Sequence, residues 1–160
     1  AALAALGVSG LPTARFVVEG FLPRSGSGRR SRLDDVAAER RTTVLFEAPH
    51  RLRQLLDELV ARCGGDRPVA LCRELTKTHE EIWRGDLGAA AARVAAIEPR
   101  GEYVVVIGGA PAPPPVDDAE LVASLRDAIA AGSSRRDAVD DVAAGAGVAR
   151  NRVYALLREV

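Results

Sequence analysis

The sequence has few of the features that mark metal-bound, secreted or membrane-spanning proteins. Among its 160 residues only Cys63 and Cys72 are cysteines, and they lack the paired spacing of a zinc site. We therefore predict no metal and two reduced thiols. No apolar run approaches the roughly 18 residues that span a bilayer, and the amino terminus lacks the pattern of a secretory signal. We expect a soluble, cytoplasmic protein with no membrane partner.

Net charge and aromatic residues are also scarce. Twenty-two basic residues balance 22 acidic ones, and aromatic residues make up 4% of a chain that is 48% apolar. A neutral molecule is not drawn to nucleic acid as a whole, so any such contact must come from a local patch. The core must consist mainly of valine, leucine, alanine and isoleucine, in one ordinary domain with a small appendage.

The chain contains an alternation of strand and helix patterns. Residues 42–46 form a β-branched and aromatic run that stops at Glu47, and helical spacing of leucines begins at Leu52. Further strands are expected at 15–22, 68–72 and 103–107, with a short extended piece at 80–84, and helices at 1–7, 24–41, 50–63 and 86–97. This order predicts an α/β layered domain with flanking helices and four or five strands.

The strand ends suggest where a ligand would bind. In an open parallel sheet, the turns that follow the carboxyl ends of the strands converge at one edge, where ligands bind. The apolar run 68–72 is typical of a parallel strand covered on both faces. We therefore expect the turns near Glu47, Arg73 and Gly101 to lie at one edge of a single sheet and to form half of a pocket.

The carboxyl-terminal third has a different composition. A proline-rich linker is expected at 111–117, between an α/β domain at 1–110 and a helical tail at 118–160 that has no strand pattern. The tail predicts three short helices and resembles a helix-turn-helix unit. Its six basic and seven acidic residues are not typical of a strong nucleic-acid binder. We expect no DNA partner, and an accessory structural or RNA-contacting role.

Five long blocks support a resemblance to a known family. They are SGLPTARFVVEGFLPR, RTTVLFEAPHRL, ALCRELTKTHEEIWRG, RGEYVVVIGG and SSRRDAVDDVAAGAGVARNRVYALL. In this order they resemble the second half of the bacterial small-subunit (16S) ribosomal RNA cytidine 2′-O-methyltransferases, of the tetrapyrrole-methylase-like superfamily. The resemblance implies two α/β domains with S-adenosylmethionine between them, a homodimer, and ribosomal RNA of the small subunit as substrate. The family's first domain is missing from this sequence, so we expect a folded part that binds the cofactor weakly and is inactive alone.

The resemblance also implies site residues. The cofactor wall comprises Phe46, Glu47, Ala48, Pro49, Arg73, Glu74, Leu75, Thr76, Gly101 and Glu102. Removing the proton of the attacking hydroxyl needs a base, for which Glu47, Glu74, Lys77 and His79 are the titratable candidates, unless the missing half supplies it or none is needed. Alternatively, Glu47, Arg73 and Glu74 form only an ion-pair network. We expect His50, beside Pro49, to cap or pack.

An arginine-rich segment supplies the local basic patch. Between residues 24 and 41, six arginines face three acids. The resemblance implies that Arg24, Arg29, Arg30 and Arg32 bind RNA phosphates. Alternatively, such a run of arginines is a solvated helix face. Two other functions remain open: a methylase of tetrapyrrole precursors, and a non-catalytic RNA-binding module.

Overall fold

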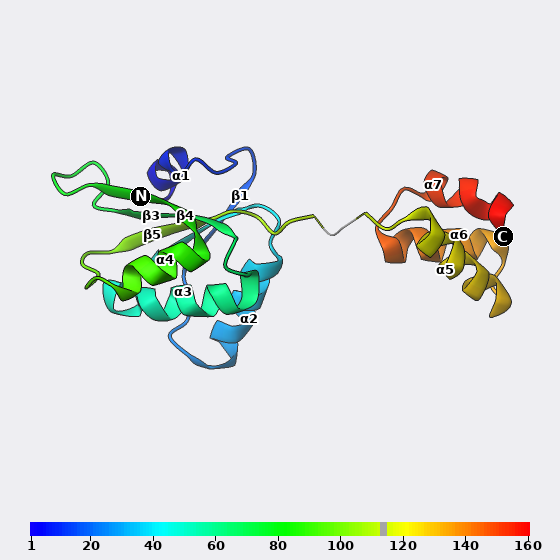
Figure 1. Cartoon of the computed structure of the whole chain (residues 1–160), viewed down its shortest axis with the longest axis horizontal. Helices are drawn as coiled ribbons and strands as arrows, with labels where there is room; N and C mark the ends of the chain where they lie inside the picture. Colours follow the sequence, from blue (N-terminus) through cyan, green and yellow to red (C-terminus); the bar gives the residue numbers. More distant parts are fainter. Residues whose placement is uncertain (113–114) are drawn as a thin grey trace. The chain divides into compact units, whose positions relative to one another are not determined.

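The computed structural model describes residues 1–112 and 115–160 (Figure 1). They form two compact units, Ala1–Ala112 and, from Pro113 to Val160, a second one. Part of the predicted linker at 111–117 therefore lies outside the described residues, and the boundaries predicted for the three segments remain predictions. None of the helices in the described ranges has the length and apolar character that a membrane crossing requires.

The first unit contains a five-stranded mixed sheet in the order β1-β2-β5-β3-β4. The strands are β1 (Phe16–Phe21), β2 (Thr42–Glu47), β3 (Pro68–Arg73), β4 (Glu81–Asp86) and β5 (Tyr103–Ile107). Only β1 and β2 are parallel, and the other three pairings are antiparallel. The expectation of a parallel sheet was therefore wrong. Residues 74–80 join β3 to β4, and this connection is too short for the crossover that parallel strands need.

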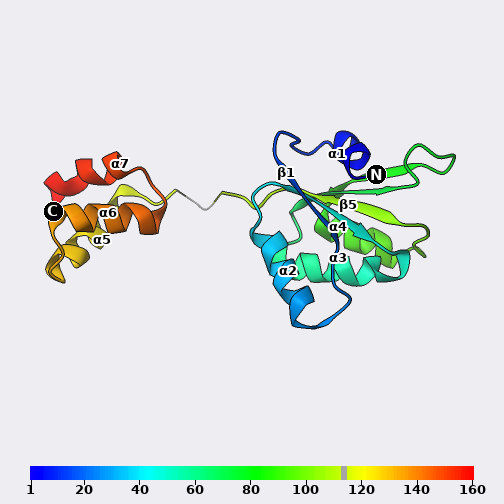
Figure 2. The same ribbon diagram turned by 180° about the vertical axis from the view of Figure 1, so that it is seen from behind.

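Helices cover both faces of this sheet, which explains its continuous apolar strands. The helices are α1 (Ala2–Ser9), α2 (Gly26–Ala38), α3 (Pro49–Cys63) and α4 (Leu87–Ala95). Helix α1 lies on one face, while α2, α3 and α4 lie on the other (Figures 1 and 2). The apolar run of β3 thus indicates that both faces of the strand are buried. In this sheet an antiparallel strand is buried in that way.

The helix ends follow local sequence signals. Asp86 caps α4, as its position predicts, because its carboxylate accepts a hydrogen bond from the Ala89 amide at 2.7 Å. Helix α1 does not end at Gly7, where we expected it to, but continues to Ser9. Gly10 ends it instead, with a φ of 76° that glycine adopts without strain.

The second unit is helical and has a core of its own. It contains α5 (Asp118–Ala130), α6 (Arg135–Ala146), α7 (Arg150–Ala155) and a 3₁₀ helix, η1 (Leu156–Glu159). The side chains of Asp117 and Ser134 cap the first two helices. The buried core consists of Leu121, Val122, Leu125, Ala138, Val139, Ala143, Val153 and Leu156.

Candidate functional site

Three chain segments meet at one edge of the sheet. Glu47 at the end of β2 pairs with Tyr103 at the start of β5, and Tyr103 pairs with Arg73 at the end of β3. The turns after Glu47 and Arg73 and the turn at Gly101 therefore lie side by side, which confirms their predicted placement. The antiparallel β5 contributes its beginning to this edge, whereas a parallel sheet would have brought only strand ends there.

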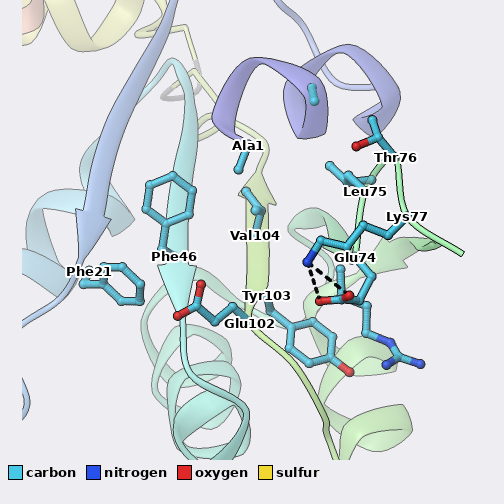
Figure 3. A pocket seen from close by; sticks show the side chains of 12 residues that line it. Ala1, Phe21, Phe46, Glu74, Leu75, Thr76, Lys77, Glu102, Tyr103 and Val104 are labelled. Atoms are coloured by element: carbon cyan, nitrogen blue, oxygen red, sulfur yellow. Dashed lines mark hydrogen bonds and ion pairs between the residues drawn. The ribbon is translucent and has the colours of Figure 1, made fainter. Parts of the chain in front are cut away.

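An open pocket of about 590 Å³ lies at this edge, on the face of the sheet that α1 covers (Figure 3). Its size falls within the range of ligand sites, roughly 300–1,000 Å³. The lining residues come from α1 and the residue before it, from β1 and β2, from the end of β3 and the loop after it, and from β5 and the residue before it. They are Ala1, Ala4, Phe21, Phe46, Arg73, Glu74, Leu75, Thr76, Lys77, Glu102, Tyr103 and Val104.

The two ends of the pocket differ in chemistry. At one end the rings of Phe21 and Phe46 lie with their centroids 5.6 Å apart and tilted by 45°. At the other end Lys77 Nζ lies 3.2 Å from a carboxylate oxygen of Glu74, an ion pair that Figure 3 shows as dashed lines. Val104 lies between the two ends. The pocket therefore offers an aromatic and aliphatic surface beside a charged pair.

The loop after β3 has an unusual backbone. Glu74 and Thr76 have φ values of 50° and 65°, in the left-handed region that residues other than glycine rarely occupy. A carboxylate oxygen of Glu80 accepts a hydrogen bond from the Thr76 amide at 2.6 Å and helps to hold this conformation. Gly101 has a φ of 71°, and a Cβ there would approach Glu74 Oε1 to 3.3 Å. Such backbone strain often occurs at ligand sites.

The guanidinium of Arg73 forms hydrogen bonds with the protein itself. Arg73 Nε donates to Glu81 at 2.7 Å, and Arg93 donates to the other oxygen of this carboxylate at 2.8 Å. These hydrogen bonds lower the pKa of Glu81, and the one from Arg93 has the larger effect. Burial raises the pKa of neighbouring Tyr103. Arg73 therefore forms an ion pair, but with Glu81 and not with Glu47 or Glu74 as the alternative supposed, and it also lines the pocket.

The side chain of Glu47 does not line the pocket. It lies on the opposite face of the sheet with 0% exposure, where Arg51 Nε is 3.3 Å from Oε1 and Arg29 Nη1 is 4.0 Å from Oε2. Adjacent strand residues point to opposite faces, so Phe46 faces the pocket and Glu47 faces α2 and α3. The prediction that the Glu47 carboxylate serves as a base is corrected, because this group is a buried ion-pair partner on the other face of the sheet. Contact of the Glu47 main chain with the cofactor stays a prediction.

The arginine-rich segment is only partly a surface. Arg29 is 2% exposed, and its guanidinium donates to Glu58 at 2.6 and 2.8 Å and to the Pro23 carbonyl at 2.9 Å. Burial alone raises the pKa of Glu58, but the hydrogen bonds from Arg29 and Gln54 outweigh it and the pKa is lowered. The predicted contact of Arg29 with RNA phosphate is therefore wrong.

The other arginines predicted to contact RNA are exposed. Arg32 pairs with Glu19, whereas Arg24 and Arg30 form no ion pair with any described residue. For these three arginines, contact with phosphate stays a prediction.

The remaining predicted residues divide between the pocket and its surroundings. Ala48, Pro49 and Gly101 lie at the same sheet edge but do not line the cavity, and His50 and His79 are exposed outside it. Glu74 and Lys77 line it, and with Glu47 removed they are the base candidates that the pocket contains. Five lining residues were not predicted from the sequence: Ala1, Ala4, Phe21, Tyr103 and Val104.

Residues 1–91 match the family model described as Tetrapyrrole (Corrin/Porphyrin) Methylases. The chain belongs to this family. The sheet edge and the pocket therefore belong to a member of the tetrapyrrole methylase family. The resemblance seen in the sequence blocks is confirmed.

Two curated relatives of this chain carry the same name. The chain is 45% identical over 151 residues to the Ribosomal RNA small subunit methyltransferase I of Mycobacterium tuberculosis (strain CDC 1551 / Oshkosh), an overlap of 94% of this chain and 52% of that protein. It is 40% identical over 162 residues to the protein of the same name from Synechocystis, over 100% of this chain and 58% of the relative. The chain therefore spans about half the length of the relatives it matches.

Solved structures of family members share the fold. The methyltransferase CobJ superposes with a TM-score of 0.54 at 21% identity, over 69% of this chain and 48% of CobJ. A cobalt precorrin-4 methyltransferase gives a TM-score of 0.53 at 18% identity, over 67% of this chain and 48% of its own. At these identities the likeness concerns the architecture alone.

Proposed function

We propose that this chain is part of an S-adenosylmethionine-dependent methyltransferase that methylates the 2′-hydroxyl of a cytidine in small-subunit ribosomal RNA. The observation that carries the proposal is the identity of 45% and 40% to proteins named ribosomal RNA small subunit methyltransferase I, over 94% and 100% of the chain. These overlaps include the helical second unit, so the likeness is not limited to the family's shared α/β part. A ribosomal substrate implies a cytoplasmic location.

The chemistry of the pocket suits this cofactor. S-adenosylmethionine combines a flat adenine, a ribose with two hydroxyls and a positively charged sulfonium, and it supplies the methyl group. The ring of Phe46 and the side chains of Val104 and Leu75 offer an apolar surface for the purine. The carboxylates of Glu102 and Glu74 offer acceptors for hydroxyl groups and favour a cation. We therefore assign the cofactor to this pocket.

The protein's task in methyl transfer is mainly one of alignment. The attacking oxygen, the methyl carbon and the sulfur must lie in line, and water must be kept away. The strained loop of Glu74–Thr76 and the short turn at Gly101 supply a stiff wall for this purpose. Glu74 and Lys77 remain the candidates in the pocket for accepting the proton of the hydroxyl. The carboxylate of Glu74 can accept it directly, whereas the ammonium of Lys77 must first give up a proton of its own.

The proposal also covers RNA binding and assembly, which involve parts of the chain outside the pocket. We propose that exposed Arg24, Arg30 and Arg32, on the loop after β1 and on α2, bind RNA phosphates, and that the second unit acts as a helix-turn-helix-like accessory module. The homodimer that the resemblance implies is part of the same proposal. No observation favours a methylase of tetrapyrrole precursors, because the structures with that chemistry match in architecture alone.

A chimera tests the proposed function with this chain itself. The matching part of the Mycobacterium tuberculosis relative is replaced by residues 1–160, which preserves the relative's remaining half. The chimera is incubated with methyl-labelled S-adenosylmethionine and small subunits from a strain that lacks the modification. We expect label in a cytidine ribose of the small-subunit RNA. Tyr154→Phe, on the exposed surface of the second unit, serves as a neutral control.

Two outcomes would contradict the proposal. Label in tetrapyrrole precursors and none in the ribosomal subunit would favour the small-molecule methylase. Tight RNA binding by the chain without any transfer by the chimera, despite transfer by the intact relative, would favour a non-catalytic RNA-binding module.

A further inference from the structure

Strand β1 contains an irregularity that changes the direction of one aromatic side chain. Val18 pairs with Val44, but the next paired residue is Gly20, which lies opposite Leu45, so Glu19 is an extra residue in the ladder. Gly20 has a φ of 70°, which residues with a Cβ rarely adopt. A bulge of this kind turns the following side chain to the other face of the sheet. Phe21 therefore faces the pocket beside Phe46, whereas a regular strand would have directed it toward α2 and α3.

The ring of Phe21 is exposed although a partner lies beside it. It is 55% exposed at the aromatic end of the pocket, and one part of it contacts the space assigned to the cofactor (Figure 3). An exposed phenylalanine gains little for folding, because most of its apolar surface stays in water. Its position on a bulge beside a ligand pocket indicates a binding role.

Two arginines, buried Arg29 and partly buried Arg51, hold the chain directly after Phe21. Arg29 donates to the Pro23 carbonyl at 2.9 Å, and Arg51 donates to the Leu22 and Pro23 carbonyls at 3.2 Å. The same two arginines flank the buried carboxylate of Glu47 at the end of β2. The ion-pair cluster thus fixes the loop after β1 to the strand that contains Phe46, and keeps the two rings in place.

We infer that Phe21 is a stacking platform for an unpaired nucleobase of the RNA substrate, at the target nucleotide. This inference rests on the proposed function. Proteins recognise bases in single-stranded RNA by stacking them on aromatic side chains, and their arginines bind the adjacent phosphates. Phe21 lines the pocket assigned to the cofactor, and Arg24, three residues further along the chain, is exposed for a phosphate. A base on Phe21 therefore places its own ribose next to the methyl donor.

The test uses the chimera and separates RNA binding from cofactor binding. Phe21→Ala should raise the KM for small subunits between about 5-fold and about 150-fold, the range that loss of one stacked base produces. Phe21→Trp should restore the KM, and Phe21→Leu should fall between the two. The affinity for S-adenosylhomocysteine, measured by calorimetry, should stay within about twofold of the parent, because Phe46 remains.

Val18→Ala is the matched control. Val18 lies on the same strand and the same face and is 47% exposed, but it does not line the pocket. The inference is overturned if Phe21→Ala leaves the KM unchanged in an active chimera, or if it weakens S-adenosylhomocysteine binding as much as it raises the KM. It is also overturned if Phe21→Ala lowers the thermal midpoint of the chimera far more than Val18→Ala, since the ring then packs against protein. Lack of transfer by the parent chimera contradicts the proposed function instead.

Discussion

Arg29 and Arg30 are neighbours in α2 but have opposite surroundings. Arg29 is buried against Glu58 and lies near Glu47, while Arg30 is exposed. Arg29→Ala should lower the free energy of unfolding by about 3 kcal/mol, because it leaves a buried carboxylate with one partner fewer. Arg30→Ala should change it by less than about 0.5 kcal/mol. Urea unfolding followed by the fluorescence of Trp83, the single tryptophan, measures both. Equal effects of the two substitutions would contradict the assigned burial.

The sequence could not distinguish these two arginines. A run of arginines in a polar segment predicts exposed side chains, and this is correct for Arg24, Arg30 and Arg32. The burial of Arg29 depends on Glu58, 29 positions further along the chain, and on a carbonyl of the preceding loop. Similarly, Glu47 follows directly after Phe46, and only the direction of the pleat decides which of the two faces the pocket.

The carboxylate of Glu81 should give the first unit a pH dependence. Its pKa is lowered from the usual 4.5 by hydrogen bonds from Arg93 and Arg73. A group with a lowered folded-state pKa stabilises the protein above its unfolded pKa, and this contribution is lost as the pH falls through the folded value. The difference in urea midpoint between the parent chain and Glu81→Gln should therefore shrink from about pH 6 to about pH 3. A difference that grows over this interval would contradict the assignment.

Glu98→Gln provides the control for this experiment. The side chain of Glu98 is 84% exposed, and its nearest partner, Arg100, is 3.5 Å away. Because such a surface pair contributes little, its midpoint should follow that of the parent chain at both pH values.

The loop after β1 and helix α2 should form the RNA-binding element. Since Arg29 is buried, a combined substitution that includes it would mix unfolding with lost binding. In the chimera, Arg24→Ala together with Arg30→Ala should flatten the dependence of log K on log salt by about 1.4 for single-stranded RNA, at about 0.7 for each phosphate contact. Fluorescence anisotropy with labelled RNA between about 50 and 200 mM salt measures this slope.

Arg135→Ala together with Arg136→Ala is the matched control for the salt titration. These two exposed arginines begin α6 in the second unit, and their removal changes the net charge by the same amount. Identical slopes for the two double variants would mean that total charge, and not the loop after β1, determines the binding.

At the level of elements, the sequence predicted strands and helices better than their directions. Apolar and β-branched runs located β1, β2, β3 and β5, because burial in a sheet needs such runs in any orientation, whereas polar β4 was predicted only as a short extended piece. The direction of β5 depends on the turn at Gly101 and on the pairing of Tyr103 with both Glu47 and Arg73. The same pairing explains why the predicted edge was correct although the parallel sheet was not. The bulge at Glu19 was not predicted from the sequence.

At the level of the whole molecule, the described residues contain separate cores. Leu55 belongs to the core between the sheet and α2, α3 and α4, while Leu125 belongs to the core of the second unit. Both side chains are 0% exposed. The second unit has fewer than 50 residues, and units of this size have small cores and low stability. Each unit should therefore respond to substitutions in its own core.

Paired leucine substitutions test whether the two units unfold independently. Leu125→Ala should cost about 2–5 kcal/mol, enough to melt the marginal second unit, because it leaves a cavity among α5, α6 and α7. Far-UV circular dichroism should then lose helix signal, while the unfolding midpoint seen by Trp83 in β4 stays that of the parent chain. Leu55→Ala should produce the reverse: a lower midpoint for Trp83 and an unchanged helical transition of the second unit. A shift of the Trp83 midpoint by Leu125→Ala would show that the two units fold as one.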